Sequence, residues 1–129
     1  MARSGLTVDI EGFAAAMSTI VEQEIDRIDA GTKKAVQKGG RAVVSGIKAS
    51  TAFSDITGEY RQGWRQKTEG SSLEGYVSTV YNADKPGLAH LIEKGHGGPH
   101  PAGAHPHIAP AYEDGVKVFE AELRKEVSG

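Results

Sequence analysis

The sequence predicts an α+β fold: a long N-terminal helix, an antiparallel β-hairpin or small sheet, a short helix, a Gly/Pro/His loop and a C-terminal helix. Three observations support this prediction. Apolar residues recur at helical spacing in the first third of the chain, two β-branched and aromatic runs follow, and a second helical pattern lies near the end. A chain of 129 residues is expected to form one domain, spanning residues 1–129.

The first predicted element is a helix over residues 10–50. Residues 29–32 and the pair Gly39–Gly40 are weak points in it, because each glycine in a helix interior costs about 1 kcal/mol relative to alanine. We therefore expect either one helix or two helical pieces. Most of its apolar residues recur at spacings that place them along one side: Met17, Val21, Ile25, Ile28, Val36, Val43 and Ile47.

Two strand-like runs follow, over residues 59–67 and 73–82, with residues 68–72 as the predicted hairpin loop. Alternation places Tyr60 and Trp64 on one face of the first run. We expect both to pack on the apolar stripe of the long helix. One of two faces of the second run joins them, either Val77, Thr79 and Tyr81 or Tyr76 and Val80.

The last third begins with a short predicted helix over residues 88–94, which ends at Gly95. Residues 96–106 are rich in Gly, Pro, His and Ala and predict an extended loop. Pro110 then suits the first turn of a closing helix, because its fixed φ fits that position. The apolar stripe of this helix is Tyr112, Val116, Phe119 and Leu123.

Composition excludes several classes of protein. The formal charge of −2 gives no overall attraction to nucleic acid or to an anionic membrane. No cysteine is present, which excludes disulfides and thiolate metal sites. The sequence has no 18-residue apolar run and no export signal at its start, so we expect a soluble protein with no membrane partner.

The five histidines lie between His90 and His107, which raises the hypothesis of a zinc or nickel site with Glu93. The spacing does not favour it, because the His105-Pro106-His107 segment points adjacent imidazoles to opposite sides. We expect a solvated loop or a partner contact, and a histidine-loop metalloprotein is the weaker alternative. Replacing four histidines together with alanine is expected to be tolerated: His96, His100, His105 and His107.

Motifs for catalysis are missing from the sequence. There is no Gly-x-Ser-x-Gly elbow, and the glycines after residue 94 lack the Lys-Ser/Thr pair of a phosphate-binding loop. Carboxylate pairs such as Glu113–Asp114 are typical of a solvated helix face. We therefore expect a protein that is not an enzyme and binds no cofactor.

One electrostatic pattern stands out, because residues 31–54 contain five basic residues and no acid. This run of basic residues is typical of the solvent-exposed side of an amphipathic helix, or of a face that contacts DNA or an acidic partner. So few charges suit weak, sequence-independent contact with phosphate. A small nucleic-acid-binding module is therefore an alternative function. Four of the basic residues line one face: Lys34, Lys38, Arg41 and Lys48.

Short motifs across the chain resemble the gene product ten-like family of tail components of long-tailed bacteriophages. They are the block 57–61 followed by Trp64, the block 80–82, the block 89–96 and the block 106–111, and residues 10–13 ahead of the long helix are also similar. We interpret the motif positions as structural: Thr57, Gly58, Trp64, Tyr81, Asn82, Glu93, Gly95, His96, Pro106 and Pro110.

The resemblance implies a ring subunit of the head–tail junction, either a neck protein or a tail-completion protein. It also implies that virion assembly requires this subunit. Implied partners are further copies of itself, the head–tail connector, the tail terminator or tail-tube proteins, with non-specific contact to packaged DNA. The implied location is the virion, after assembly in the host cytoplasm. The basic stripe and the acidic side of the last helix (Glu113, Glu120 and Glu122) offer unlike faces for a ring contact. Alternatively, the stripe lines the ring and meets DNA.

Overall fold

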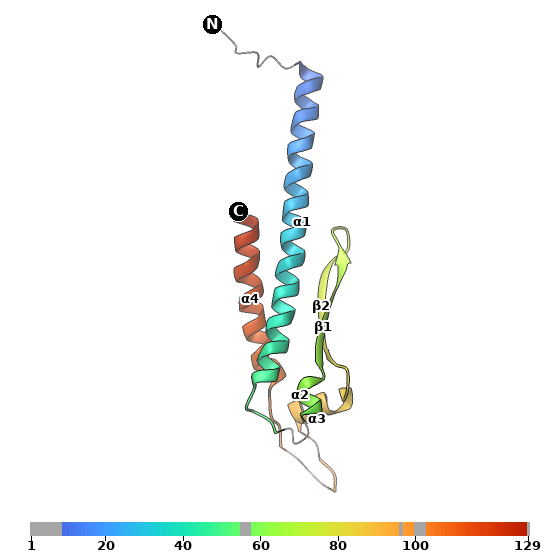
Figure 1. Ribbon diagram of the computed structural model, residues 1–129, viewed down its shortest axis with the longest axis vertical. Helices are drawn as coiled ribbons and strands as arrows, with labels where there is room; N and C mark the ends of the chain where they lie inside the picture. Colours follow the sequence, from blue (N-terminus) through green and yellow to red (C-terminus); the bar gives the residue numbers. More distant parts are fainter. Residues whose placement is uncertain (1–8, 55–57, 96, 100–102, 129) are drawn as a thin grey trace.

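The structure is a computed structural model that describes residues 9–54, 58–95, 97–99 and 103–128. Its elements are α1 (Ile10–Ala49), α2 (Glu59–Gln62), β1 (Trp64–Ser71), β2 (Gly75–Asn82), α3 (Pro86–Lys94) and α4 (Ile108–Ser128). Figure 1 shows α1 as a long rod, with α4 along one side of its C-terminal half and the hairpin along another. The predicted α+β fold is confirmed.

α1 is one unbroken helix of 40 residues, so the alternative of two pieces is wrong. The glycines expected to weaken it are the places where other elements approach its backbone. A Cβ on Gly39 would lie 2.9 Å from Phe119 Cβ, and a Cβ on Gly40 would lie 1.9 Å from Ser78 Oγ. The close packing on both sides offsets the intrinsic cost of glycine in a helix.

α4 packs on α1 through small residues. Ala111 and Gly115 are buried, and a Cβ on Gly115 would lie 2.3 Å from Val43 Cγ2 and 3.0 Å from Gly39 O. The two backbones can approach this closely only because both glycines lack a side chain. The apolar stripe predicted for the last helix lies beside this contact and is exposed or half-buried: Tyr112, Val116, Phe119 and Leu123.

The first strand-like run is corrected at its start. Residues 59–62 form the helical turn α2, and the strand begins only at Trp64. Residues four apart lie on the same side of a strand and on nearly the same side of a helix. The spacing of Tyr60 and Trp64 therefore could not distinguish a strand from a helical turn. Both rings are buried as expected, with exposed fractions of 2% and 3%.

The turn of the hairpin is shorter than predicted. Trp64 pairs with Asn82 and Ser71 pairs with Gly75, so the predicted loop 68–72 is mostly strand and residues 72–74 make the turn. Gly70, at φ 119°, accommodates the close approach, since a Cβ there would lie 1.9 Å from Gly75 O. Pairing with the β-branched and aromatic second strand outweighs the polar composition of the segment.

Of the two candidate faces of β2, the one that carries Tyr76 and Val80 is turned toward the body and is half-buried. Tyr76 Oη donates to both carboxylate oxygens of Asp29 on α1, at 2.8 and 2.9 Å. The opposite face, with Val77 and Tyr81, is exposed. The hairpin thus packs on α1 as expected, through the alternative that includes Tyr76.

The core lies at the C-terminal end of α1, and the apolar stripe of the other half of this helix is exposed. The buried residues of this core are Val43, Ile47, Phe53, Tyr60, Trp64 and Ala111. Only part of the predicted stripe is covered, because four of its members are 38–57% exposed: Met17, Val21, Ile25 and Ile28. α4 and the hairpin lie beside only the C-terminal half of the rod (Figure 1).

The punctuation of the last third is confirmed. α3 begins at Pro86, two residues earlier than predicted, where the fixed φ of proline suits a helix start. It ends at Gly95, whose φ is 76° and whose N–H donates to Leu91 O at 2.8 Å. Pro110 lies in the first turn of α4.

Gly115→Ala should lower the free energy of unfolding by about 1–3 kcal/mol, because the new methyl group meets Val43 and the backbone of Gly39. This loss should appear although alanine favours a helix by roughly 1 kcal/mol. Gly87→Ala in α3 is the matched control, since a Cβ there meets nothing within 4 Å. Urea unfolding measures both. Equal stability of the two variants would contradict the close packing of α1 and α4.

Candidate functional site

Several residues of the family motif blocks, Tyr60, Trp64 and Glu93 among them, meet around the buried His107. His107 is 1% exposed and lies among the rings of Phe53, Tyr60 and Trp64, with centroids 4.7, 5.7 and 6.2 Å away. Its Nε2 is 2.6 Å from Tyr60 Oη, and its Nδ1 is 2.9 Å from both Glu93 Oε1 and His105 O. Both ring nitrogens are therefore engaged.

The expectation of a solvated histidine loop is therefore wrong for His107. Its partners come from α2 and α3, which lie far from it in the sequence, so composition alone could not reveal its burial. His105 is exposed, as expected, and its backbone N–H donates to Ile92 O at 2.7 Å. Replacing His107 with alanine would empty a core position, so the expected tolerance does not extend to this residue.

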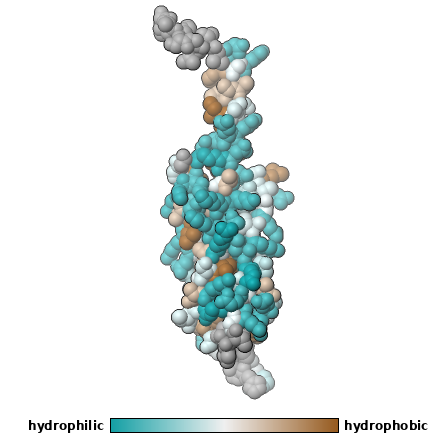
Figure 2. All heavy atoms as spheres, in the orientation of Figure 1, coloured by the Kyte–Doolittle hydropathy of each residue, from teal (hydrophilic) through white to brown (hydrophobic). Residues whose placement is uncertain are grey.

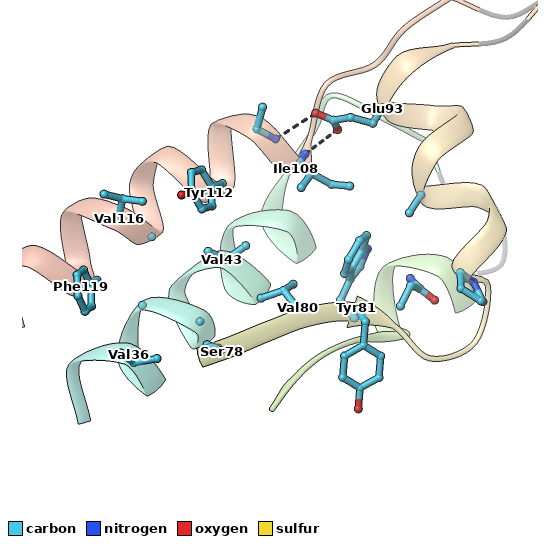
Figure 3. A pocket seen from close by; sticks show the side chains of 18 of the residues that line it. Val36, Val43, Ser78, Val80, Tyr81, Glu93, Ile108, Tyr112, Val116 and Phe119 are labelled. Atoms are coloured by element: carbon cyan, nitrogen blue, oxygen red, sulfur yellow. Dashed lines mark hydrogen bonds between the residues drawn. The ribbon is translucent and has the colours of Figure 1, made fainter. Parts of the chain in front are cut away.

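Glu93 caps the start of α4 from the neighbouring helix α3. Its carboxylate accepts hydrogen bonds from the backbone N–H groups of His107 at 2.7 Å, Ile108 at 2.8 Å and Ala109 at 3.1 Å. Figure 3 shows Glu93 beside the start of α4, with its bond to Ile108. These donors have no partner inside the helix, and a negative charge there is favoured by the helix dipole. Burial alone would raise the pKa of Glu93, but these hydrogen bonds and His107 together lower it.

Asn82 ties the hairpin to α2 and to the turn before α3. It is 4% exposed, and its Nδ2 donates to Tyr60 O at 2.7 Å. Its Oδ1 accepts from the N–H groups of Asp84 at 3.1 Å and Lys85 at 2.8 Å. A buried side-chain amide that satisfies three backbone groups is costly to replace, because each lost partner would be left desolvated.

Arg61 holds the end of α1 and was not singled out from the sequence. Its guanidinium donates to Lys48 O at 2.6 Å and Ser50 O at 2.7 Å, and lies 4.3 Å from the centroid of Phe53. The last carbonyls of a helix need external donors, and a cation there also interacts favourably with the dipole. The signal that could have revealed it was an arginine close after a long helix with no glycine cap.

The basic stripe is divided by the fold. Lys34 lies 3.6 Å from Glu122 and 3.1 Å from Glu126, and Lys38 lies 3.1 Å from Glu122. The hydrogen bond from Lys38 lowers the pKa of Glu122, and the bond to Glu126 raises the pKa of Lys34. In the part of the chain that the structure describes, Arg41 has no ion pair and is exposed, and Lys48 has none and is half-buried.

The remaining motif positions are mostly at the surface. Pro106 and Pro110 are exposed at the start of α4, and Tyr81 is 40% exposed on the outer face of the hairpin. Gly58, at φ 78°, begins α2 in the left-handed conformation that favours glycine. Thr57 and His96 lie outside the described residues, as does His100.

A groove opens between α1, α4 and the hairpin. It has a volume of about 830 Å³, and Figure 3 shows Val36, Val43, Val80, Tyr112, Val116 and Phe119 around it. Trp64 also lines it, and among the described residues nothing accepts a hydrogen bond from its buried Nε1. A buried indole N–H usually has an acceptor, so Trp64 Nε1 is an exception to the polar pairing seen elsewhere at this end of the molecule.

Within the described ranges, no group of three or more His, Asp or Glu side chains could hold a metal ion. The described helices also include none that is long and apolar enough to cross a membrane. The contacts of Glu93, His107 and Asn82 fix backbone geometry, and each polar atom in them faces a partner in the chain.

Glu93→Gln should lower the free energy of unfolding at neutral pH by about 1–3 kcal/mol, because charged hydrogen bonds to three N–H groups are weakened. The pKa of folded Glu93 lies below its ordinary value of 4.5, so its contribution is present above that pH and is lost as pH falls through the folded pKa. The two proteins should converge in acid. Glu120→Gln, on the exposed side of α4, is the control and should change little. A difference between Glu93→Gln and wild type that is independent of pH would contradict the capping role.

A family model described as "Bacteriophage HK97-gp10, putative tail-component" matches residues 11–95. Neither the search of curated proteins nor the search of solved structures returns a match. The matched stretch takes in α2, the hairpin, α3 and nearly all of α1, which is more than half of the chain. It includes Trp64, Asn82 and Glu93, and the resemblance seen in the sequence is confirmed. This chain belongs to the HK97-gp10-like family of bacteriophage tail components.

Proposed function

We propose that this protein is a non-enzymatic structural subunit of the head–tail junction, in the neck or tail-completion ring, and that virion assembly requires it. The observation that carries the proposal is the use of the motif residues. The polar atoms of Glu93 and Asn82 form hydrogen bonds with backbone groups. The buried ring of His107 contacts Tyr60 of α2 and Glu93 of α3. Such contacts favour a fixed shape over turnover. Its location would be the virion, after assembly in the host cytoplasm.

The proposed partners are further copies of this chain and the neighbouring connector, tail-terminator or tail-tube proteins. Contacts in a ring are heterologous, so each subunit needs two unlike surfaces. The pairing of the basic stripe with α4, considered from the sequence for a contact between subunits, exists inside one subunit at Glu122, which is 6% exposed. Glu122 is thus engaged by its own chain, and another pair of surfaces has to join the copies.

Non-specific contact with packaged DNA is the second candidate role. Lys33 and Arg41 are exposed, and among the residues described here neither has an ion pair. Two such charges per subunit, repeated around a ring, would suit weak contact with phosphates that lets the genome pass.

Phage that lack this chain should accumulate filled heads and separate tails, and supplying the wild-type protein in trans should restore joined, infectious particles. Electron microscopy of lysates, with plaque counts, measures both. Supplying Glu120→Gln should restore particles as well as wild type does, since this exposed position lies outside the contacts described above. Normal joining of heads and tails without the protein would overturn the proposed role.

A further inference from the structure

The N-terminal half of α1 carries an apolar stripe that no other described part of the subunit covers. We call residues 10–27 the arm. Figure 2 shows tan and brown residues gathered on this protruding end. Six apolar side chains of the arm are 44–88% exposed: Ile10, Phe13, Met17, Ile20, Val21 and Ile25. An exposed apolar stripe of this length marks a binding surface in a folded protein.

The stripe continues the face of α1 that α4 covers further along. Gly31 and Ala35 on that face are buried, and a Cβ on Gly31 would lie 2.6 Å from Glu126 Cβ. α4 ends where Arg27 donates to Glu126 O at 2.5 Å and Val127 O at 3.2 Å. Beyond that point α1 extends alone (Figure 1). The arm therefore has the pattern of a packed helix but lacks a packing partner among the residues that the structure describes.

Charge indicates which partner fits. The arm contains four acidic residues and one basic residue, whereas residues 31–54 contain five basic residues and no acid. Two arms side by side would bring like charges together. An arm that lies on the groove of another copy would instead bring its acidic side toward Lys94, an exposed cation that lines the groove.

The groove between α1, α4 and the hairpin supplies the matching surface. Its walls are mostly apolar, and its volume of about 830 Å³ suits a few large side chains but not a whole helix. Phe13, Met17 and Ile20 recur at the i, i+4 and i+7 spacing of helices that dock in such grooves.

We infer that the arm of one subunit docks in the groove of a second copy of this chain, with Phe13, Met17 and Ile20 as anchors. The contact joins two unlike surfaces of one molecule, so repetition leads from copy to copy and closes into a ring if the rotation permits. This inference rests on the proposed function in one respect only, since it names the contact that the proposed ring requires.

Four full-length variants test the contact in sedimentation experiments over a range of protein concentrations. Met17→Glu places a charge on the stripe, and Gln23→Glu adds the same charge to the arm away from it. Tyr112→Glu places a charge on the wall of the groove, and Ala121→Glu does so elsewhere on α4. Circular dichroism checks that each variant is folded. Trp64, the only tryptophan, reports occupation of the groove through its emission.

Wild type and the two controls should associate as concentration rises, with a parallel change in Trp64 emission. Met17→Glu and Tyr112→Glu should each remain monomeric. A mixture of these two should form a one-to-one dimer, because one intact arm and one intact groove remain. Association of Met17→Glu like wild type would overturn the inference, as would a mixture that stays monomeric or a wild-type protein that is monomeric at its solubility limit.

The outcomes separate this contact from the proposed role in the virion. If the protein associates through arm and groove but phage assemble normally without it, the contact is supported and the proposed role is overturned. Joined particles that require the chain but assemble equally well with Met17→Glu would support the role and overturn the contact.

Discussion

The close approach of α1 and α4 is the constraint on which the rest of the structure depends. Gly39 and Gly115 let the two backbones meet, and this contact fixes the face of α1 that α4 covers. The hairpin uses the adjacent face, where Gly40 leaves room for Ser78. The groove is the space that remains between them, and the arm is the length of α1 that α4 does not reach.

The lower end of the molecule gives α4 its direction. Glu93 supplies acceptors for the first N–H groups of α4, and His107 joins this carboxylate to Tyr60. Asn82 connects the same tyrosine to the hairpin through its carbonyl. The polar contacts thus link α2, α3, α4 and the hairpin, so loss of one partner would leave buried groups unsatisfied on several elements.

Local patterns predicted the elements whose causes are local. The order of the helices, the end of α3 at Gly95 and the burial of Trp64 follow from spacing and from the conformational limits of glycine and proline. Contacts between remote segments could not be predicted in this way. His107 is buried because Tyr60, 47 positions earlier, lies against it. Glycine disfavours a helix by its own propensity, but at Gly39 it allows the close contact with α4 that offsets this cost. The arm followed the helical pattern, but the pattern could not show whether its partner lies in the same chain.

The central claim is that one half of α1 is packed within the subunit and that the other half becomes packed only on assembly. Hydrogen exchange along α1 tests this claim most directly. In the dilute isolated protein, amides of residues 31–49 should exchange slowly and those of residues 10–26 quickly, with the change near Arg27, where α4 ends. In assembled particles residues 10–26 should become protected as well. Equal protection of both halves in the isolated subunit, or fast exchange of residues 10–26 in the particle, would contradict the account.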